Sequence, residues 1–407
     1  MLKISLARLR RDLTALARFG SNPGGGVSRS AWSPAHEEAR AWLLARMKEA
    51  GLETSVDPAG NTFGRHGDGA PLVLTGSHID SVPDGGTLDG ALGVLAALEC
   101  LRTIREAGLP VKRPLAVVAW SDEEGRYGSL FGSRAFTGKL DAAKIPEMRA
   151  SDGERLVDAM ARAGFNAREA PRAPADPGSV AAYVELHIEQ GPHLEAKGIP
   201  IGVVEGIVGI RRNRIVFQGE PDHAGTTPMA RRKDAFLAAA EYALKAREHV
   251  VKRGSGRSVT NFGVVEVRPG VTNIVPSRAA LLQEMRELDG KVLDRLDREC
   301  VALAKRIARR RGIRVAIERI SRNEPARMAP EVQRAIEAAA AELRLQTLRM
   351  PSGAGHDAQN LATVTRAGMI FIPSKGGKSH RPDEASDWRA IERGANVLLH
   401  TLLKLAG

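Results

Sequence analysis

The stretch Pro71-Leu-Val-Leu-Thr-Gly-Ser-His-Ile-Asp80 begins as a short apolar strand and ends in side chains that can bind or orient a metal ion. The run Pro114–Trp120 is a second apolar strand, and it leads into Glu123 and Glu124. Between these strands, residues 91–105 are expected to form a helix. Strands that alternate with helices predict a mixed, parallel-rich α/β sheet flanked by helices. Such sheets place their ligands beyond the carboxyl ends of the strands, where these polar residues lie.

The middle of the chain has a different order of elements. We expect strands at 214–218, 259–267, 278–288 and 314–318, and helices at 229–253 and 292–311. The order β-α-β-β-α-β is that of a ferredoxin-like α+β sandwich. The sequence therefore predicts an inserted domain over residues 208–324. Residues 1–207 and 325–407 would together form the catalytic domain.

The charge of the chain allows more than one class of partner. Its formal net charge is +12, which is typical of proteins that bind nucleic acids. However, the chain has only 3 Tyr and 4 Trp to stack on bases. Its hydrophobic content of 43% and charged content of 27% are those of an ordinary globular protein. We therefore expect no nucleic-acid partner.

Cysteine content and hydropathy bear on location. Cys100 and Cys300 are the only cysteines, which excludes a disulfide framework and a thiolate zinc site. Two cysteines fit a reducing cytoplasm. No apolar run reaches the roughly 18 residues that a membrane helix needs. The segment Leu2–Phe19 is expected to form an amphipathic helix and lacks the uncharged core of a secretory signal. We expect a cytoplasmic protein without a membrane partner.

Several imidazoles and carboxylates stand in contexts that suit a two-metal hydrolase. The candidate metal ligands are His78, Asp89, Glu124, His187 and His380. Nitrogen and oxygen ligands without a thiolate suit Zn, Mn, Co or Ni. Two divalent ions need a carboxylate that bridges them. Asp89, which lies between Gly85-Gly86 and Gly90, is the candidate for that position, although a surface turn is the alternative.

Adjacent glutamates can divide the work of a metal site. One carboxylate can bind a metal ion while the other accepts a proton from the attacking water. On an exposed helix such a pair has no function, but Glu123-Glu124 directly follows an apolar strand. Asp80, two residues after His78, can fix the tautomer of that imidazole. His187 would end a strand and point to the site, although a hydrogen-bonded core histidine is the alternative.

The inserted domain carries three further candidates. His223 lies in a polar turn, where an electrophilic histidine could reach the substrate carbonyl. Asn273 and Arg286 also belong to this domain, and an arginine can bind a substrate carboxylate in a bidentate manner. For Arg286, an ordinary surface position on a strand is the alternative.

The motifs of this chain, in their order, resemble those of the M20-type metallopeptidase superfamily. They are Gly24-Gly-Gly-Val-Ser-Arg29, Asp57-Pro-Ala-Gly-Asn61, Gly76-Ser-His-Ile-Asp-Ser81, Gly85-Gly-Thr-Leu-Asp-Gly90, Glu185-Leu-His-Ile-Glu-Gln-Gly-Pro192, Asp222-His-Ala-Gly-Thr-Thr-Pro228 and Gly353-Ala-Gly-His-Asp-Ala358. The run His-Ile-Glu-Gln-Gly-Pro is similar to that of the hydantoinase/carbamoylase branch, which contains N-carbamoyl-L-amino-acid hydrolases, β-ureidopropionases and allantoate amidohydrolases. The resemblance extends over nearly the whole chain.

The resemblance implies a role for each candidate. His78 and His187 would bind one metal ion, Glu124 and His380 the other, and Asp89 both. Glu123 would be the general base, and Asp80 would orient His78. The positions that match substrate-contacting residues are Gln190, His223, Asn273, Arg286 and His356. The inserted domain would be a lid and dimerisation domain, so the protein would be a homodimer, with His223 acting in its own subunit or in the partner.

We therefore predict a metal-dependent amidohydrolase that cleaves the C–N bond of an N-carbamoyl (ureido) amino acid or a related ureido acid such as allantoate. A deacylase of N-acyl amino acids or a dipeptidase of the same superfamily is the alternative. A non-catalytic polyanion-binding protein would be a different class, but it would not need Glu123 beside Glu124. The loop Arg126–Phe131 is shorter than its counterpart in the family that the chain resembles, so the substrate preference does not follow from the resemblance. The sequence alone does not name the metal.

Overall fold

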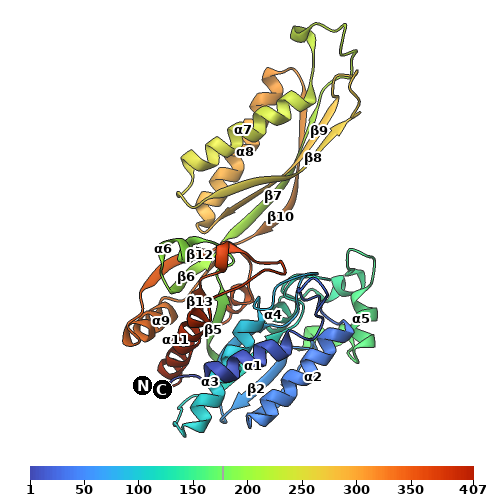
Figure 1. Cartoon of the computed structure of the whole chain (residues 1–407). Helices are drawn as coiled ribbons and strands as arrows, with labels where there is room; N and C mark the ends of the chain where they lie inside the picture. The colour runs from blue at the N-terminus through green and yellow to red at the C-terminus, as the bar shows by residue number, and fades with distance from the viewer. Residues whose placement is uncertain (177) are drawn as a thin grey trace. The chain divides into compact units, whose positions relative to one another are not determined.

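The chain folds into two compact units (Figure 1). The computed structural model describes residues 1–176 and 178–407. Unit 1 comprises Met1–Gly206 and Arg327–Gly407, and unit 2 comprises Ile207–Ala326. Unit 2 overlaps the inserted domain expected at residues 208–324, whose role as a lid stays a prediction.

Unit 1 is built on a mixed sheet with the order β1-β2-β4-β3-β5-β13-β6-β11, and β12 pairs with β6. Its centre is parallel, because β3 pairs in parallel with β4 and β5, and β5 with β13. The strands are β1 (Glu53–Val56), β2 (Thr62–His66), β3 (Leu72–His78), β4 (Leu115–Trp120), β5 (Val180–Ile188), β6 (Ile201–Ile207), β11 (Ala326–Arg327), β12 (Thr347–Ser352) and β13 (Arg366–Ile372). The predicted parallel-rich α/β fold is confirmed.

Helices flank this sheet, and α3 is buried along nearly its whole length. They are α1 (Leu6–Leu16), α2 (Pro34–Glu49), α3 (Ala91–Glu106), α4 (Phe131–Phe136), α5 (Leu156–Arg162), α6 (His193–Lys197), α9 (Pro330–Glu342), α10 (Ala358–Leu361) and α11 (Trp388–Ala406). Short 3-10 helices are η1 (Ala142–Glu147), η2 (Ala167–Arg172) and η4 (Lys375–Gly377). Apolar side chains of α3, α9 and α11 pack with those of the central strands into one core. The ends of the strands are thereby held in fixed register.

Unit 2 is a four-stranded antiparallel sheet with two helices on one face. Its elements are β7 (Gly209–Gln218), η3 (Met229–Arg231), α7 (Ala235–Arg253), β8 (Val259–Arg268), β9 (Arg278–Glu287), α8 (Gly290–Arg310) and β10 (Arg314–Asn323). The strand order β10-β7-β9-β8 is that of the predicted ferredoxin-like sandwich. The helix expected from Met229 begins only at Ala235, because the side chain of Asp234 accepts the backbone N–H of Leu237 and caps it there.

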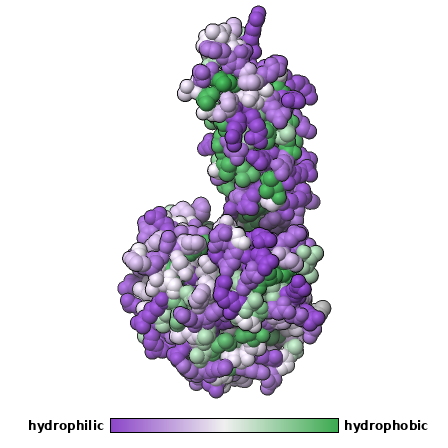
Figure 2. Space-filling model, turned by 90° about the vertical axis from the view of Figure 1, so that its right-hand side faces the viewer, coloured by the Kyte–Doolittle hydropathy of each residue, from purple (hydrophilic) through white to green (hydrophobic). Residues whose placement is uncertain are grey.

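Most of the net positive charge of the chain lies in unit 2. Residues 207–326 contain 25 Lys and Arg against 14 Asp and Glu, whereas the whole chain has 60 against 48. The surface of this unit also shows hydrophobic side chains between the polar ones (Figure 2). Of the helices in the described residues, none is both apolar and long enough to cross a membrane.

Candidate metal centre

The carboxyl ends of neighbouring strands bring the candidate ligands together. His78 is the last residue of β3, His187 lies near the end of β5, and the glutamate pair follows β4. Asp89 comes from the loop before α3, and His380 from the segment between β13 and α11. Because β4, β3, β5 and β13 are adjacent, their ends meet at one edge of the sheet.

Asp89 lies at the centre of this group. Its Oδ1 is 3.1 Å from His187 Nε2 and 3.7 Å from His78 Nε2. Its Oδ2 is 3.1 Å from His380 Nε2, which in turn is 3.6 Å from Glu124 Oε2. The ligand atoms of His78, Asp89 and His187 lie within 4.8 Å of one another, as do those of Asp89, Glu124 and His380. One carboxylate therefore belongs to both triads.

The residues of both triads fit divalent metal ions. They offer only imidazole nitrogens and carboxylate oxygens, the ligands that suit such ions. Glu124 Oε1 is buried and has no hydrogen-bond partner within the described residues. A buried acceptor without a partner is costly unless a ligand satisfies it. The arrangement can hold two cations that share Asp89.

Burial and crowding shift the titration of the carboxylates. Burial raises the pKa of Glu123 well above its ordinary value, and the nearby Asp357 and Glu124 carboxylates raise it further. Burial likewise raises the pKa of Glu124 to about 7. Burial also disfavours ionised Asp89, but hydrogen bonds with His187 and His380 hold its pKa well below the ordinary value. Glu123, beside the triads and 3.6 Å from His78 Nε2, is thus suited to gain and release a proton.

Asp80 connects the two halves of the centre. Its backbone oxygen lies 3.0 Å from His78 Nδ1, whereas its carboxylate Oδ1 is 3.7 Å away. The carboxylate instead accepts the backbone N–H of Glu123 at 3.4 Å and of Glu124 at 3.1 Å. Asp80 therefore orients the imidazole mainly through its carbonyl and fixes the glutamate pair through its side chain.

Glu384 positions Asp89 and was not among the residues predicted from the sequence. Its Oε1 accepts the backbone N–H of Leu88 at 3.1 Å and of Asp89 at 3.0 Å. Its Oε2 accepts the hydroxyl of Ser379, which lies next to His380, at 2.8 Å. The acidic run that follows His380 was the available signal, but acidic residues there are equally typical of a surface turn.

Two of the candidate substrate residues lie beside the triads in unit 1. Gln190 Nε2 donates to Asp89 Oδ2 at 2.9 Å, and its Oε1 is buried without a partner in the described part of the chain. His356 Nε2 is 2.9 Å from Ser352 Oγ, and its ring centroid is 4.5 Å from that of His187. Burial lowers the pKa of His356 well below its ordinary value, so this imidazole is neutral.

The other three candidates lie in unit 2. His223 is exposed, and its Nδ1 accepts the backbone N–H of Gly225 at 3.0 Å and of Thr226 at 3.2 Å. The ring hydrogen of neutral His223 therefore resides on Nε2, which can act as a donor. The backbone N–H of Ala224 donates to Asn273 O at 3.0 Å, so His223 and Asn273 are neighbours. Arg286 lies near the opposite end of β9.

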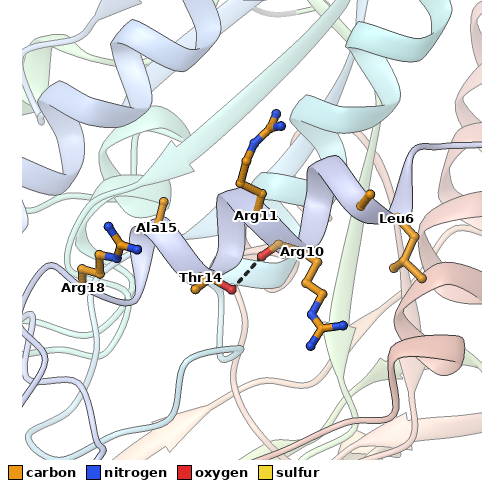
Figure 3. A pocket seen from close by; sticks show the side chains of 7 residues that line it. Leu6, Arg10, Arg11, Thr14, Ala15 and Arg18 are labelled. Atoms are coloured by element: carbon orange, nitrogen blue, oxygen red, sulfur yellow. Dashed lines mark hydrogen bonds between the residues drawn. The ribbon is translucent and has the colours of Figure 1, made fainter.

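A hollow lined by side chains of α1 and of Arg18, just beyond its end, is separate from these residues (Figure 3). It is lined by Leu6, Ala7, Arg10, Arg11, Thr14, Ala15 and Arg18. None of the candidate catalytic, metal or substrate residues lines it, and the hydroxyl of Thr14 is bonded to the backbone oxygen of Arg10. This hollow offers no ligand set comparable with the two triads.

Comparison with known proteins agrees with this geometry. Residues 74–404 match the family described as Peptidase family M20/M25/M40. The chain is 39% identical over 405 residues to an N-carbamoyl-L-amino acid amidohydrolase of Geobacillus stearothermophilus, covering 98% of both chains. It is 37% identical over 406 residues to an allantoate amidohydrolase of Escherichia coli, covering 98% of this chain and 97% of that one.

A solved hydantoinase/carbamoylase family amidase from Burkholderia ambifaria has the same fold, with a TM-score of 0.92 and 36% identity over 100% of this chain and 99% of that chain. The resemblance found in the motifs is thus confirmed over the whole length. The chain belongs to peptidase family M20/M25/M40.

Proposed function

We propose that this protein is a metal-dependent amidohydrolase that cleaves the C–N bond of a ureido acid, such as an N-carbamoyl-L-amino acid or allantoate. The observation that carries the proposal is the pair of triads that share Asp89, with Glu123 beside them. Such an arrangement suits hydrolysis, and a protein that only binds a ligand would not need a proton acceptor such as Glu123 beside the triads. The relatives named as amidohydrolases support the ureido bond as the target.

The side chains divide the reaction between them. When bound, divalent ions would polarise the carbonyl and acidify the attacking water. Glu123 accepts the proton of that water and later returns it to the leaving nitrogen, as its raised pKa favours. His223 Nε2–H donates to the oxygen on which negative charge develops. Arg286 binds the carboxylate of the substrate.

The protein is proposed to act in the cytoplasm. Cys100 and Cys300 are both buried free thiols, as is typical of proteins in a reducing compartment.

The dimensions of unit 2 bear on which subunit supplies each residue. Arg278 pairs with Gln218 at one end of the ladder, and Arg286 pairs with Ile210 near the other. Eight residues of a strand span about 27 Å, and Asn273 lies still farther from Arg286 along the chain. An N-carbamoyl amino acid is about as long as two extended residues, or ~7 Å. One molecule of substrate therefore cannot touch Arg286 and Asn273 of the same chain. We infer a homodimer in which His223 and Asn273 reach the site of the other copy.

Exposed apolar residues of unit 2 support this pairing. On α7, Leu237, Leu244 and Val251 are 41%, 67% and 62% exposed. They are seven residues apart and so share one face of the helix. The edge strand β8 also exposes Val259, Val264 and Val265. Apolar faces of this kind are typical of surfaces that pair with a second copy.

A mixed dimer tests the shared site. We would co-express a His223→Ala chain and an Arg286→Ala chain with different tags and purify the heterodimer. If the site combines two copies, the heterodimer should have about half the activity of the wild-type dimer, because one of its two sites has both residues. If both residues act within one chain, neither site is complete, and the heterodimer should be as inactive as the single mutants.

The activity is tested with a metal-loaded enzyme and a panel of N-carbamoyl amino acids, ureidopropionate, allantoate, N-acetyl amino acids and dipeptides. We expect ureido acids to be the best substrates. Faster cleavage of dipeptides or N-acetyl amino acids would instead assign a peptidase or deacylase.

The proposed bridging role of Asp89 is tested by metal content. Asp89→Ala should lose both ions after dialysis, as measured by elemental analysis. Full retention of two ions would exclude a bridging role for this carboxylate.

A further inference from the structure

Glu284 lies between two arginines on the open face of the unit 2 sheet. On β9 it stands directly opposite Arg212 of β7, and Arg286 follows two residues later on the same face. Arg286 Nε donates to Glu284 Oε1 at 2.7 Å, and Arg212 Nε donates to Glu284 Oε2 at 2.5 Å. One carboxylate thus binds two guanidinium groups, with one oxygen for each.

This cluster is set apart from the core of the unit. The alternate residues of β9, among them Leu281 and Met285, point into the core with α7 and α8, so Glu284 and Arg286 point to the opposite face. The side chains of Arg212, Glu284 and Arg286 remain 40%, 23% and 32% exposed. Burial alone would raise the pKa of Glu284, but its bonds with Arg286 and Arg212 hold it below the ordinary value. The carboxylate is therefore ionised at neutral pH.

We propose that Glu284 is a specificity-determining residue, which holds Arg286 ready for the carboxylate of the substrate and keeps Arg212 from binding a second carboxylate. The inference rests on the proposed function, in which Arg286 binds the acid group. The Glu284 carboxylate already binds Arg212, the cation beside Arg286 that a second substrate carboxylate would otherwise bind. The site accordingly favours ureido acids with one carboxylate over those with two.

The chemistry of a carboxylate explains the selectivity. Its two oxygens can accept from two arginines at once, whereas a glutamine has one amide oxygen and one amide nitrogen that only donates. Because each oxygen of Glu284 accepts from one arginine, Glu284→Gln removes the acceptor that one of the two arginines uses. The released cation, and the removal of a like charge beside the incoming substrate, should both favour a diacid.

The test compares a monoacid, N-carbamoyl-L-alanine, with a diacid, N-carbamoyl-L-aspartate, in the metal-loaded enzyme. We expect the ratio of kcat/KM for the diacid to that for the monoacid to rise about tenfold in Glu284→Gln, mainly through KM. Glu266→Gln is the matched control, because Glu266 contacts Arg214 and Arg278 on the same sheet face at 3.1 and 3.6 Å. It removes the same charge and should leave the ratio unchanged.

Three outcomes overturn the inference: an unchanged ratio in a folded Glu284→Gln enzyme, an equal rise in Glu266→Gln, or a rise that persists when Arg212→Met is added to Glu284→Gln. If Glu284→Gln is poorly folded, Glu284→Asp serves in its place, because the shorter carboxylate keeps its charge but cannot reach both arginines. Failure of the proposed function has a different signature. In that case Arg286→Lys lowers kcat/KM equally for an acid and its neutral amide, whatever Glu284 does.

Discussion

Glu123 is not a metal ligand in the proposed mechanism. Its replacement should therefore impair proton transfer without affecting metal binding. Glu123→Gln keeps the size of the side chain and removes the proton acceptor. We expect both metal ions and the substrate affinity to be retained while kcat falls about 10³-fold or more. Turnover and metal content measured on the same preparation check this. Near-normal turnover by the metal-loaded variant would exclude Glu123 as the base.

His187 makes the stability of the metal-free protein depend on pH. Burial would lower its pKa, but the hydrogen bond with Asp89 raises it from 6.5 to about 9. A raised pKa in the folded state stabilises the fold fully below the unfolded value, and this contribution disappears as the pH rises through about 9. The melting temperature of the metal-free protein should therefore fall between neutral and alkaline pH.

In the metal-loaded protein this dependence should be absent, because metal-bound histidines carry no exchangeable proton at the ligand nitrogen. The comparison is a series of melting temperatures with and without chelator across that pH window, with His187→Gln as control. A metal-free protein that becomes more stable toward alkaline pH would contradict the assignment.

The candidate ligands could be predicted from sequence because each follows an apolar strand or a glycine-rich turn, and such positions meet at one edge of a sheet. Their supporting contacts could not be predicted. Glu384 is 295 residues from Asp89, whose backbone N–H it accepts. The carboxylate of Asp80 accepts the backbone N–H groups of Glu123 and Glu124, which are 43 and 44 residues away in the sequence. Only the folded chain reveals such pairs.

At the scale of elements, the loop after β4 depends on one buried carboxylate. Asp122 Oδ1 accepts the backbone N–H of Arg126 at 2.8 Å, and its Oδ2 accepts those of Tyr127 and Gly128 at 3.1 Å each. Asp122→Ala leaves these donors without an acceptor, which should cost about 3 kcal/mol in the unfolding free energy of unit 1. Thermal or urea unfolding measures the loss. Asp152→Ala is the control, because that carboxylate is exposed where it contacts Arg126 and the backbone N–H of Glu154, so its removal should change little.

Long elements could be predicted from the sequence, and short or strained ones could not. The helix at 91–105 and the strand at 114–120 match α3 and β4 nearly to the residue. The two-residue strand β11 has no periodicity that could reveal it. Asp122, Gln190 and His380 adopt positive φ of 51°, 57° and 58° at the candidate site. Such conformations are unfavourable for these residues and are sustained only by the surrounding structure.

At the scale of the whole molecule, assembly and activity should be lost together. Leu244 is the most exposed of the three apolar residues on the free face of α7. Leu244→Glu places a charge in the proposed interface, so the protein should sediment as a monomer at micromolar concentration and lose most of its activity. Ala302→Glu, on the exposed side of α8, is the control and should leave the dimer intact. A fully active Leu244→Glu monomer would mean that each chain holds a complete site.

The order of elements in unit 2 could be predicted because each strand and helix is long and periodic. Which residues of the unit act together could not be predicted. Their separation along β9 follows only from the strand register, in which Arg286 pairs with Ile210 and Arg278 with Gln218.

The concentration of net positive charge in unit 2 also affects the rate at which anionic substrates encounter the protein. A unit with 25 basic and 14 acidic residues is surrounded by a positive electrostatic potential, which extends about 8 Å into physiological saline. This potential concentrates small anions near the protein and accelerates their diffusional encounter. Added salt should then slow the capture of ureido acids and leave that of their neutral amides unchanged. Unit 2 would thus gather its anionic substrate from solution before any side chain touches it.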